Sequence, residues 1–200
     1  MLTAATHCVK VLGVRARSVH TPQSDQLVEV APGLKCPALL QIEGETDDEV
    51  YGFVIEVVPQ GGRLVARSVK VHQRVGGPPV TGEAIRSIPV ATMVRAAAGG
   101  ILVEHPDEEG SSIKLLSPIG LMGGVVPEAY LPRLRQNGPT DETLQWVARV
   151  YRVALLLSDP PTKAVEALFE VPRSTAGRWV AAARRRGFLG RSEGAGRAGG

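Results

Sequence analysis

Pro172 constrains the fold of this chain more than any other residue, because it lies between two short segments with helical periodicity. Proline is not tolerated inside a helix but suits its first turn. Before Pro172, residues 162–169 place on one helix face the apolar side chains of Val165, Leu168 and Phe169. After it, residues 173–186 place on one face those of Ala176, Trp179, Val180 and Ala183. The sequence therefore predicts a helix, a turn at 170–172 and a second, crossing helix.

The opposite face of the second predicted helix is polar. Arginine makes bidentate contacts to guanine, serine and threonine bond bases or phosphates, and a helix N-terminus offers amide groups to a phosphate. The last turn is rich in arginine, which suits the negative end of the helix dipole, and Gly187 is placed to end the helix. We expect the DNA-binding residues to be Arg173, Ser174, Thr175, Gly177, Arg178, Arg184 and Arg185.

Residues 160–189 resemble the helix-turn-helix of bacterial transcription regulators. The likeness extends over residues 139–190 and is strongest to actinobacterial hypothetical proteins in which a run like PTKAV…VPRSTAGRWV…ARRRGFL closes the chain. The resemblance implies a DNA-binding fold in which Arg173 to Arg178 face DNA. Three positions depart from the general pattern: Glu166 replaces a small residue, Glu170 replaces the usual turn glycine, and Pro172 replaces a Ser or Thr cap.

The positive charge of the chain is concentrated in the same region. The net charge is only +3, but residues 133–200 carry 12 Lys and Arg against 6 Asp and Glu. Residues 1–132 carry 11 against 14. Lys163 is the only lysine of the C-terminal part, and arginine is the residue that binds phosphate and guanine through two parallel bonds. Because phosphate binding depends on local charge, this distribution favours nucleic acid as the partner.

The N-terminal part has β-sheet patterns. Residues 50–58 and 63–71 are rich in β-branched and aromatic side chains and flank a Pro-Gln-Gly-Gly turn, which predicts a hairpin. Residues 101–104 and 113–116 predict two more strands around an acidic turn at 106–110. Residues 82–98 predict a helix that Pro89 kinks or divides. Residues 117–137, with three prolines, predict a connection with at most short helices, and a helix from Thr140 or Asp141 to Leu157 follows.

These elements predict the α+β class. We expect a small α+β domain with an antiparallel sheet at 1–117, a linker at 118–139, an all-α three-helix helix-turn-helix domain at 140–190 and a disordered tail at 191–200. No apolar run approaches the ~20 residues of a membrane helix, and two cysteines suit a reducing cytoplasm. No catalytic motif, nucleotide loop or metal-ligand spacing is present, so we expect no enzymatic activity and no cofactor or metal.

The function that the sequence favours is sequence-specific binding of double-stranded DNA in transcriptional regulation. A homodimer is expected because such modules commonly bind two half-sites. One alternative is a protein-interaction module whose basic helix binds an acidic partner. Another is a DNA-processing role in replication or in a mobile element. The sequence leaves a small-molecule effector and the role of the N-terminal domain open.

Overall fold

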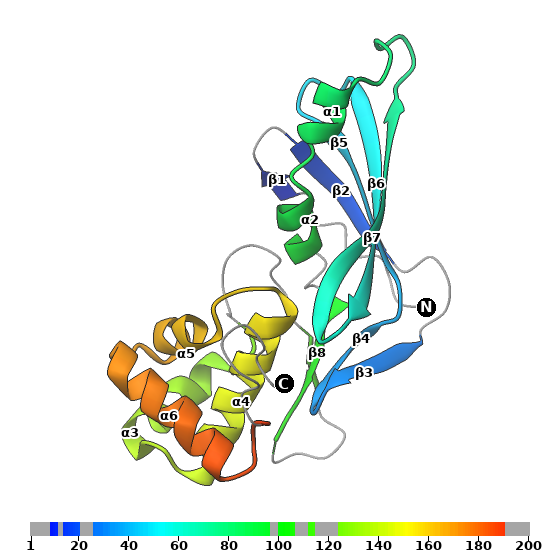
Figure 1. The fold of residues 1–200 in the computed structure, drawn as a ribbon. Coiled ribbons are helices and arrows are strands. Elements are labelled where there is room, and N and C mark those ends of the chain that lie inside the picture. The colour runs from blue at the N-terminus through cyan, green and yellow to red at the C-terminus, as the bar shows by residue number, and fades with distance from the viewer. Residues whose placement is uncertain are drawn as a thin grey trace.

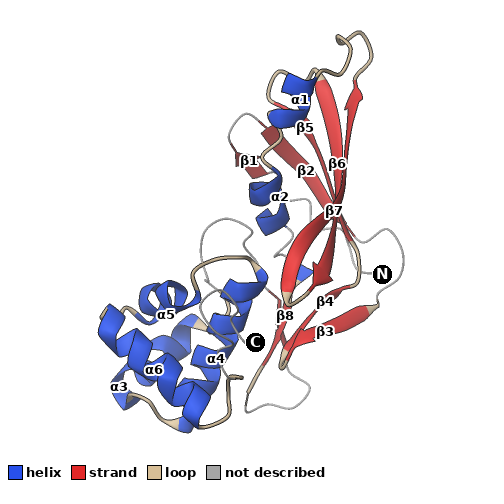
Figure 2. Cartoon of the chain, in the orientation of Figure 1, coloured by secondary structure: helices blue, strands red, loops and turns tan. Residues whose placement is uncertain are grey.

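The computed structural model describes residues 9–11, 14–20, 26–96, 100–106, 112–114 and 124–190 (Figure 1). Two antiparallel sheets and a group of helices make up these residues, which confirms the predicted α+β class. Figure 2 shows strands gathered on one side and the helices α3–α6 on the other. Outside the described residues lie the predicted tail at 191–200, most of the acidic turn, residues 115–116 of the strand predicted at 113–116 and residues 117–123 of the predicted connection.

The larger sheet has the strand order β1-β2-β5-β6-β7. Its strands are β1 (Val9–Val11), β2 (Val14–His20), β5 (Leu40–Thr46), β6 (Tyr51–Gln60) and β7 (Arg63–Gln73). The predicted hairpin is confirmed as β6 and β7, but both strands are longer than expected. The turn needs only Gly61 and Gly62, whose φ angles of 58° and 71° favour glycine and suit a two-residue hairpin loop.

The smaller sheet has the order β3-β4-β8-β9, with β3 (Leu27–Ala31), β4 (Leu34–Pro37), β8 (Leu102–Glu104) and β9 (Ser112–Lys114). The strands β8 and β9 correspond to the two predicted around the acidic turn, and β9 begins one residue earlier than expected. Since β4 pairs with β8, this sheet joins parts of the chain that are far apart in sequence.

Two short helices follow β7 in the chain. The predicted helix at 82–98 is divided at Pro89 into α1 (Gly82–Arg86) and α2 (Val90–Ala96), and residues 97–99 lie outside the described part. The hydroxyl of Thr81 accepts a bond from the Ala84 amide and caps α1. Met93 of α2 is fully buried where α2 packs on β6 and β7.

The helical unit, residues 124–190, contains α3 (Leu131–Asn137), α4 (Asp141–Leu156), α5 (Pro161–Phe169) and α6 (Arg173–Arg185), preceded by a 3-10 turn at Glu128–Tyr130. The short helix α3 falls in the segment predicted to connect two domains. Its Leu134 is fully buried, and the Leu134 carbonyl accepts a bond from the Thr143 hydroxyl. Helix α3 therefore belongs to the packed core of the helices.

The central helix α4 begins where predicted, with the Thr140 hydroxyl accepting a bond from the Thr143 amide at 3.3 Å. It packs against α3, α5 and α6 and also contacts β4 and β7 (Figure 1). Buried side chains of both parts form one continuous hydrophobic core. The position of the helices relative to the sheets is thus set largely by α4.

Two arginines of α4 bind backbone carbonyls of the sheet region. The Arg149 Nε donates to the Glu104 carbonyl at 2.8 Å, and the buried Arg152 donates to the carbonyls of Pro32 and Phe188. Burial lowers the pKa of Arg152, and the nearby charge of Arg149 adds to this effect. Arg152 therefore ties α4 both to the β3–β4 turn and to the chain that follows α6.

Replacing Arg152 with methionine keeps an unbranched side chain in the core but removes the donors to both carbonyls. We expect Arg152→Met to lower the free energy of unfolding by about 2 kcal/mol, because two hydrogen bonds from a charged, buried donor group are lost. Denaturant unfolding followed by circular dichroism measures the change. Arg67→Ala is the control, since it removes a surface ion pair with Glu56 that is worth at most about 1 kcal/mol. If both substitutions lower the free energy of unfolding by the same small amount, Arg152 does not stabilise the contacts of α4 with the β3–β4 turn and with the chain after α6.

Candidate nucleic-acid interface

The packing of α5 against α6 follows the two apolar faces predicted from the sequence. Val165 and Phe169 of α5 are buried, as are the α6 side chains Ala176, Trp179, Val180 and Ala183. The rings of Phe169 and Trp179 meet edge to face, with centroids 5.6 Å apart. The two helices are separate and join at Pro172, as predicted, and α5 begins one residue earlier than expected.

The turn between α5 and α6 depends on Glu170, which has left-handed backbone angles of φ 48° and ψ 42°. Glycine takes this conformation with less strain, so the departure noted at this position has a structural cost. Arg135 of α3 supports the turn, because its guanidinium bonds the Leu168 carbonyl and pairs with the Glu170 carboxylate at 2.8 Å. Glu170 thus makes the turn while its side chain anchors it to α3.

Helix α6 begins directly after Pro172, whose carbonyl accepts bonds from the amides of Thr175 and Ala176. No side chain caps this end of the helix. The helix ends near Arg186, and Gly187 follows with a φ of 80°, as the sequence predicts for a residue that ends a helix. The apolar side of α6 lies on α4 and α5, which leaves its polar side at the surface.

Six of the seven predicted DNA-binding residues lie on the outer side or at the flanks of α6. Arg173, Ser174, Arg178 and Arg185 are exposed, and Thr175 and Gly177 are half-buried. Arg184 differs from them. Its Nη2 donates to the Tyr151 hydroxyl at 2.6 Å, and its guanidinium carbon lies 4.9 Å from the centre of the Tyr151 ring. The structure therefore gives Arg184 a partner on α4, where a cation–π contact and a hydrogen bond hold α6 in place.

Most arginines of the helical unit are engaged within the protein. Arg133 pairs with Glu142, Arg135 with Glu170, and Arg186 with Asp141. Arg149 and Arg152 donate to backbone carbonyls and Arg184 to Tyr151. Within residues 124–190, the cations without a carboxylate partner or a buried role are Lys163, Arg173, Arg178 and Arg185.

Three of these four cations lie on α6, which has no acidic residue. A helix with this pattern carries uncompensated positive charge along its whole exposed side. The fourth, Lys163, is exposed on α5 and was not among the predicted site residues. Sequence reasoning counted Lys163 in the basic excess but had no signal that it would stay unpaired while neighbouring arginines found partners.

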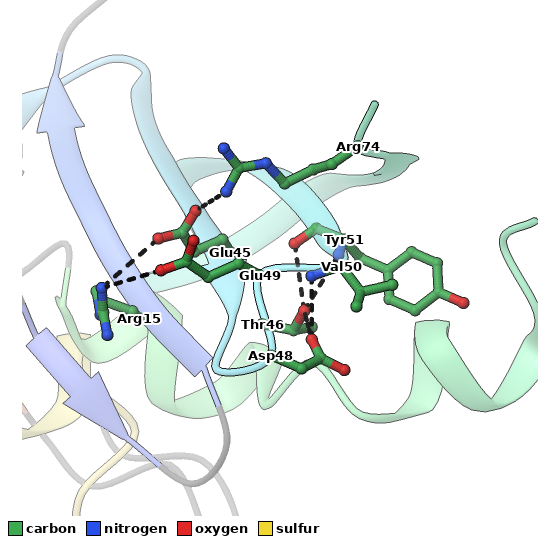
Figure 3. Close-up of polar contacts among 8 residues, drawn as sticks. All are labelled: Arg15, Glu45, Thr46, Asp48, Glu49, Val50, Tyr51 and Arg74. Carbon is green, nitrogen blue, oxygen red and sulfur yellow. Dashed lines mark hydrogen bonds and ion pairs between the residues drawn. The ribbon is translucent and has the colours of Figure 1, made fainter. Parts of the chain in front are cut away.

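A second dense group of charges lies at one end of the larger sheet, where Glu45 of the central strand β5 is buried (Figure 3). Arg74 bonds one Glu45 oxygen, and Arg15 lies 3.8 Å from the other and 3.7 Å from Glu49. In the adjoining turn the Asp48 carboxylate accepts bonds from the Thr46 hydroxyl and the Val50 amide, which lower the pKa of Asp48. The charges of this cluster are paired within it, so the cluster closes the end of the sheet.

The remaining candidate residues give no chemical site. Burial raises the pKa of the Cys36 thiol to about 11, so this cysteine is protonated and unreactive at neutral pH. Cys8 lies outside the described residues. Across the described parts of the chain, no three His, Cys, Asp or Glu side chains gather as a metal site would require. Over those same residues, none of the helices is both long and apolar enough to span a bilayer.

Comparison of the chain with models of known protein families gives no match. Comparisons with curated proteins and with solved structures also give none.

Gly177 provides a test of the exposed face of α6. A Cβ atom built at this position meets nothing within 4 Å, so the folded chain itself has no use for a glycine there. Glycine inside a helix costs roughly 0.5–1 kcal/mol relative to alanine. We therefore expect Gly177→Ala to raise the free energy of unfolding by about that amount, measured by denaturant unfolding. Unchanged or lower stability of the variant would mean that a side chain at position 177 does meet other atoms of the folded chain.

Proposed function

We propose that this chain binds double-stranded DNA in a sequence-specific manner through the exposed side of α6 and acts in transcriptional regulation. The observation that carries the proposal is the pairing of charges in the helical unit. Arg173, Arg178 and Arg185 have no carboxylate partner among the described residues, whereas the arginines around them are engaged. A row of unpaired cations on one helix is the charge pattern that phosphate groups neutralise.

The residue types on this face suit the major groove. A helix of 13 residues is about 20 Å long, and the major groove admits an α-helix. Arginine provides bidentate contacts to guanine and phosphate. The small side chains of Ser174 and Gly177 let the helix backbone approach a partner closely, and α6 keeps a glycine here that its own fold does not require.

The packing supports the same use of α6. Its buried residues and the contact between Arg184 and Tyr151 hold the helix firmly on α4, so the exposed side chains have a fixed platform. A rigid element orders fewer groups when it binds than a flexible one. Because one helix supplies few base contacts, we infer that two copies of the chain bind two half-sites together.

The proposal is tested by selection of duplexes from a randomised library with the full-length chain at physiological salt. We expect an enriched motif, bound at least about 10³-fold more tightly than random duplex, and its symmetry reports whether two copies bind. No enrichment, together with weak binding that salt abolishes, contradicts sequence-specific DNA binding and points to an acidic protein as the partner of the same face.

The unpaired arginines are tested by the double variant Arg173→Ala/Arg178→Ala on the selected duplex. We expect affinity to fall by at least about tenfold and the dependence of log K on log salt to become shallower by about 1 to 2. The matched control is Arg67→Ala/Arg133→Ala, which removes the same charge from exposed ion pairs with Glu56 and Glu142. Equal losses in both variants mean that overall charge, and not the α6 face, determines binding.

A further inference from the structure

Among the unpaired arginines of α6, Arg178 is held by another side chain. Its Nη2 donates a hydrogen bond to the Thr175 Oγ1 at 3.0 Å, one helical turn earlier. No side-chain bond of this kind is present at Arg173 or Arg185 within the described residues. The two arginines at the ends of the helix therefore keep their rotational freedom, whereas the central one is fixed over the exposed face.

We propose that Thr175 is a positioning residue that presents Arg178 to a guanine in the major groove, so that Arg178 determines which sequence the chain prefers. The inference rests on the proposed function and goes further, because it names the base and separates the roles of the three arginines. Arg178 reads a base edge, and Arg173 and Arg185 contact phosphates, which tolerate many geometries.

The geometry of the guanidinium allows this division of labour. An arginine side chain has five N–H donors arranged as two forks of parallel bonds, and guanine accepts one fork at O6 and N7. The bond to Thr175 uses a single hydrogen of Nη2 and leaves one complete fork available. Thr175 can therefore aim the group without consuming the donors that a guanine needs.

Threonine is suited to the positioning role. Two heavy atoms on Cβ restrict its χ1 angle in a helix to two main rotamers, so its hydroxyl has few possible positions. A free arginine loses considerable rotamer entropy when it is held against a base. Because Thr175 already restricts Arg178 in the unbound chain, less rotamer entropy is lost when Arg178 binds DNA. The contact between Arg178 and guanine is strengthened by the same amount.

The test uses the full-length chain and the randomised duplex library, with the variants Thr175→Val, Thr175→Ser and Arg178→Ala. Valine has the shape of threonine but no hydroxyl, and serine restores the acceptor. We expect the wild type to enrich a motif with an essential guanine. Thr175→Val lowers the preference for that guanine by about fivefold to tenfold, Thr175→Ser restores most of it, and affinity for random duplex stays unchanged in both.

A combined variant separates positioning from a direct contact of Thr175 with DNA. In the Arg178→Ala background, Thr175→Val should change the base preference by less than about twofold, because no arginine remains to be positioned. Arg185→Ala serves as a control, and it should weaken all duplexes alike without altering the preferred base.

The outcomes distinguish this inference from the proposed function. A wild-type chain that enriches no sequence overturns both. An enriched motif whose guanine preference is unchanged in Thr175→Val, or fully additive losses in the combined variant, overturns the positioning role alone. A guanine preference that survives Arg178→Ala overturns the assignment of Arg178 as the residue that reads the base.

Discussion

The burial of α4 is the constraint on which the rest of the structure depends. Most of this helix is enclosed, with α3, α5 and α6 on one side and strands of both sheets nearby. Burying an arginine is costly, and Arg152 offsets much of that cost because its two terminal nitrogens bond carbonyls from the β3–β4 turn and from the chain after α6. Its buried Nε has no hydrogen-bond partner among the described residues. The two carbonyl bonds fix the helices against the sheets. This polar group thus adds to the shared hydrophobic core in joining the two parts of the chain.

The surface of α6 follows from this arrangement. Its apolar residues rest on α4 and α5, and Arg184 adds a contact to Tyr151 that turns one of its arginines inward. The remaining arginines have no carboxylate partner among the described residues, and three nearby carboxylates, those of Asp141, Glu142 and Glu170, pair with Arg186, Arg133 and Arg135. The unpaired charge on α6 therefore depends partly on where these three carboxylates lie.

The sequence could predict the elements whose signals are local. Pro172 and the two apolar faces beside it predicted α5 and α6. The glycines at 61 and 62, between two β-rich segments, predicted the β6–β7 hairpin. Contacts between distant residues had no local signal. The pairing of β4 with β8, the partner of Arg184 and the support that Arg135 gives to Glu170 all depend on the assembled fold. For the same reason the sequence predicted the same role for Arg184 and Arg178. In the folded chain Arg184 holds α6 on α4, whereas Arg178 is exposed.

The pairing of charges also explains why composition alone is a poor guide to this chain. A net charge of +3 on 200 residues suggests no strong attraction to nucleic acid. What a phosphate meets, however, is the local charge within about one Debye length, roughly 8 Å at physiological salt. An ion pair contributes little to that local field, whereas an unpaired arginine contributes fully. The proposed attraction to DNA therefore depends on a few unpaired residues of α6, and a glutamate placed beside them would weaken this attraction without altering the fold.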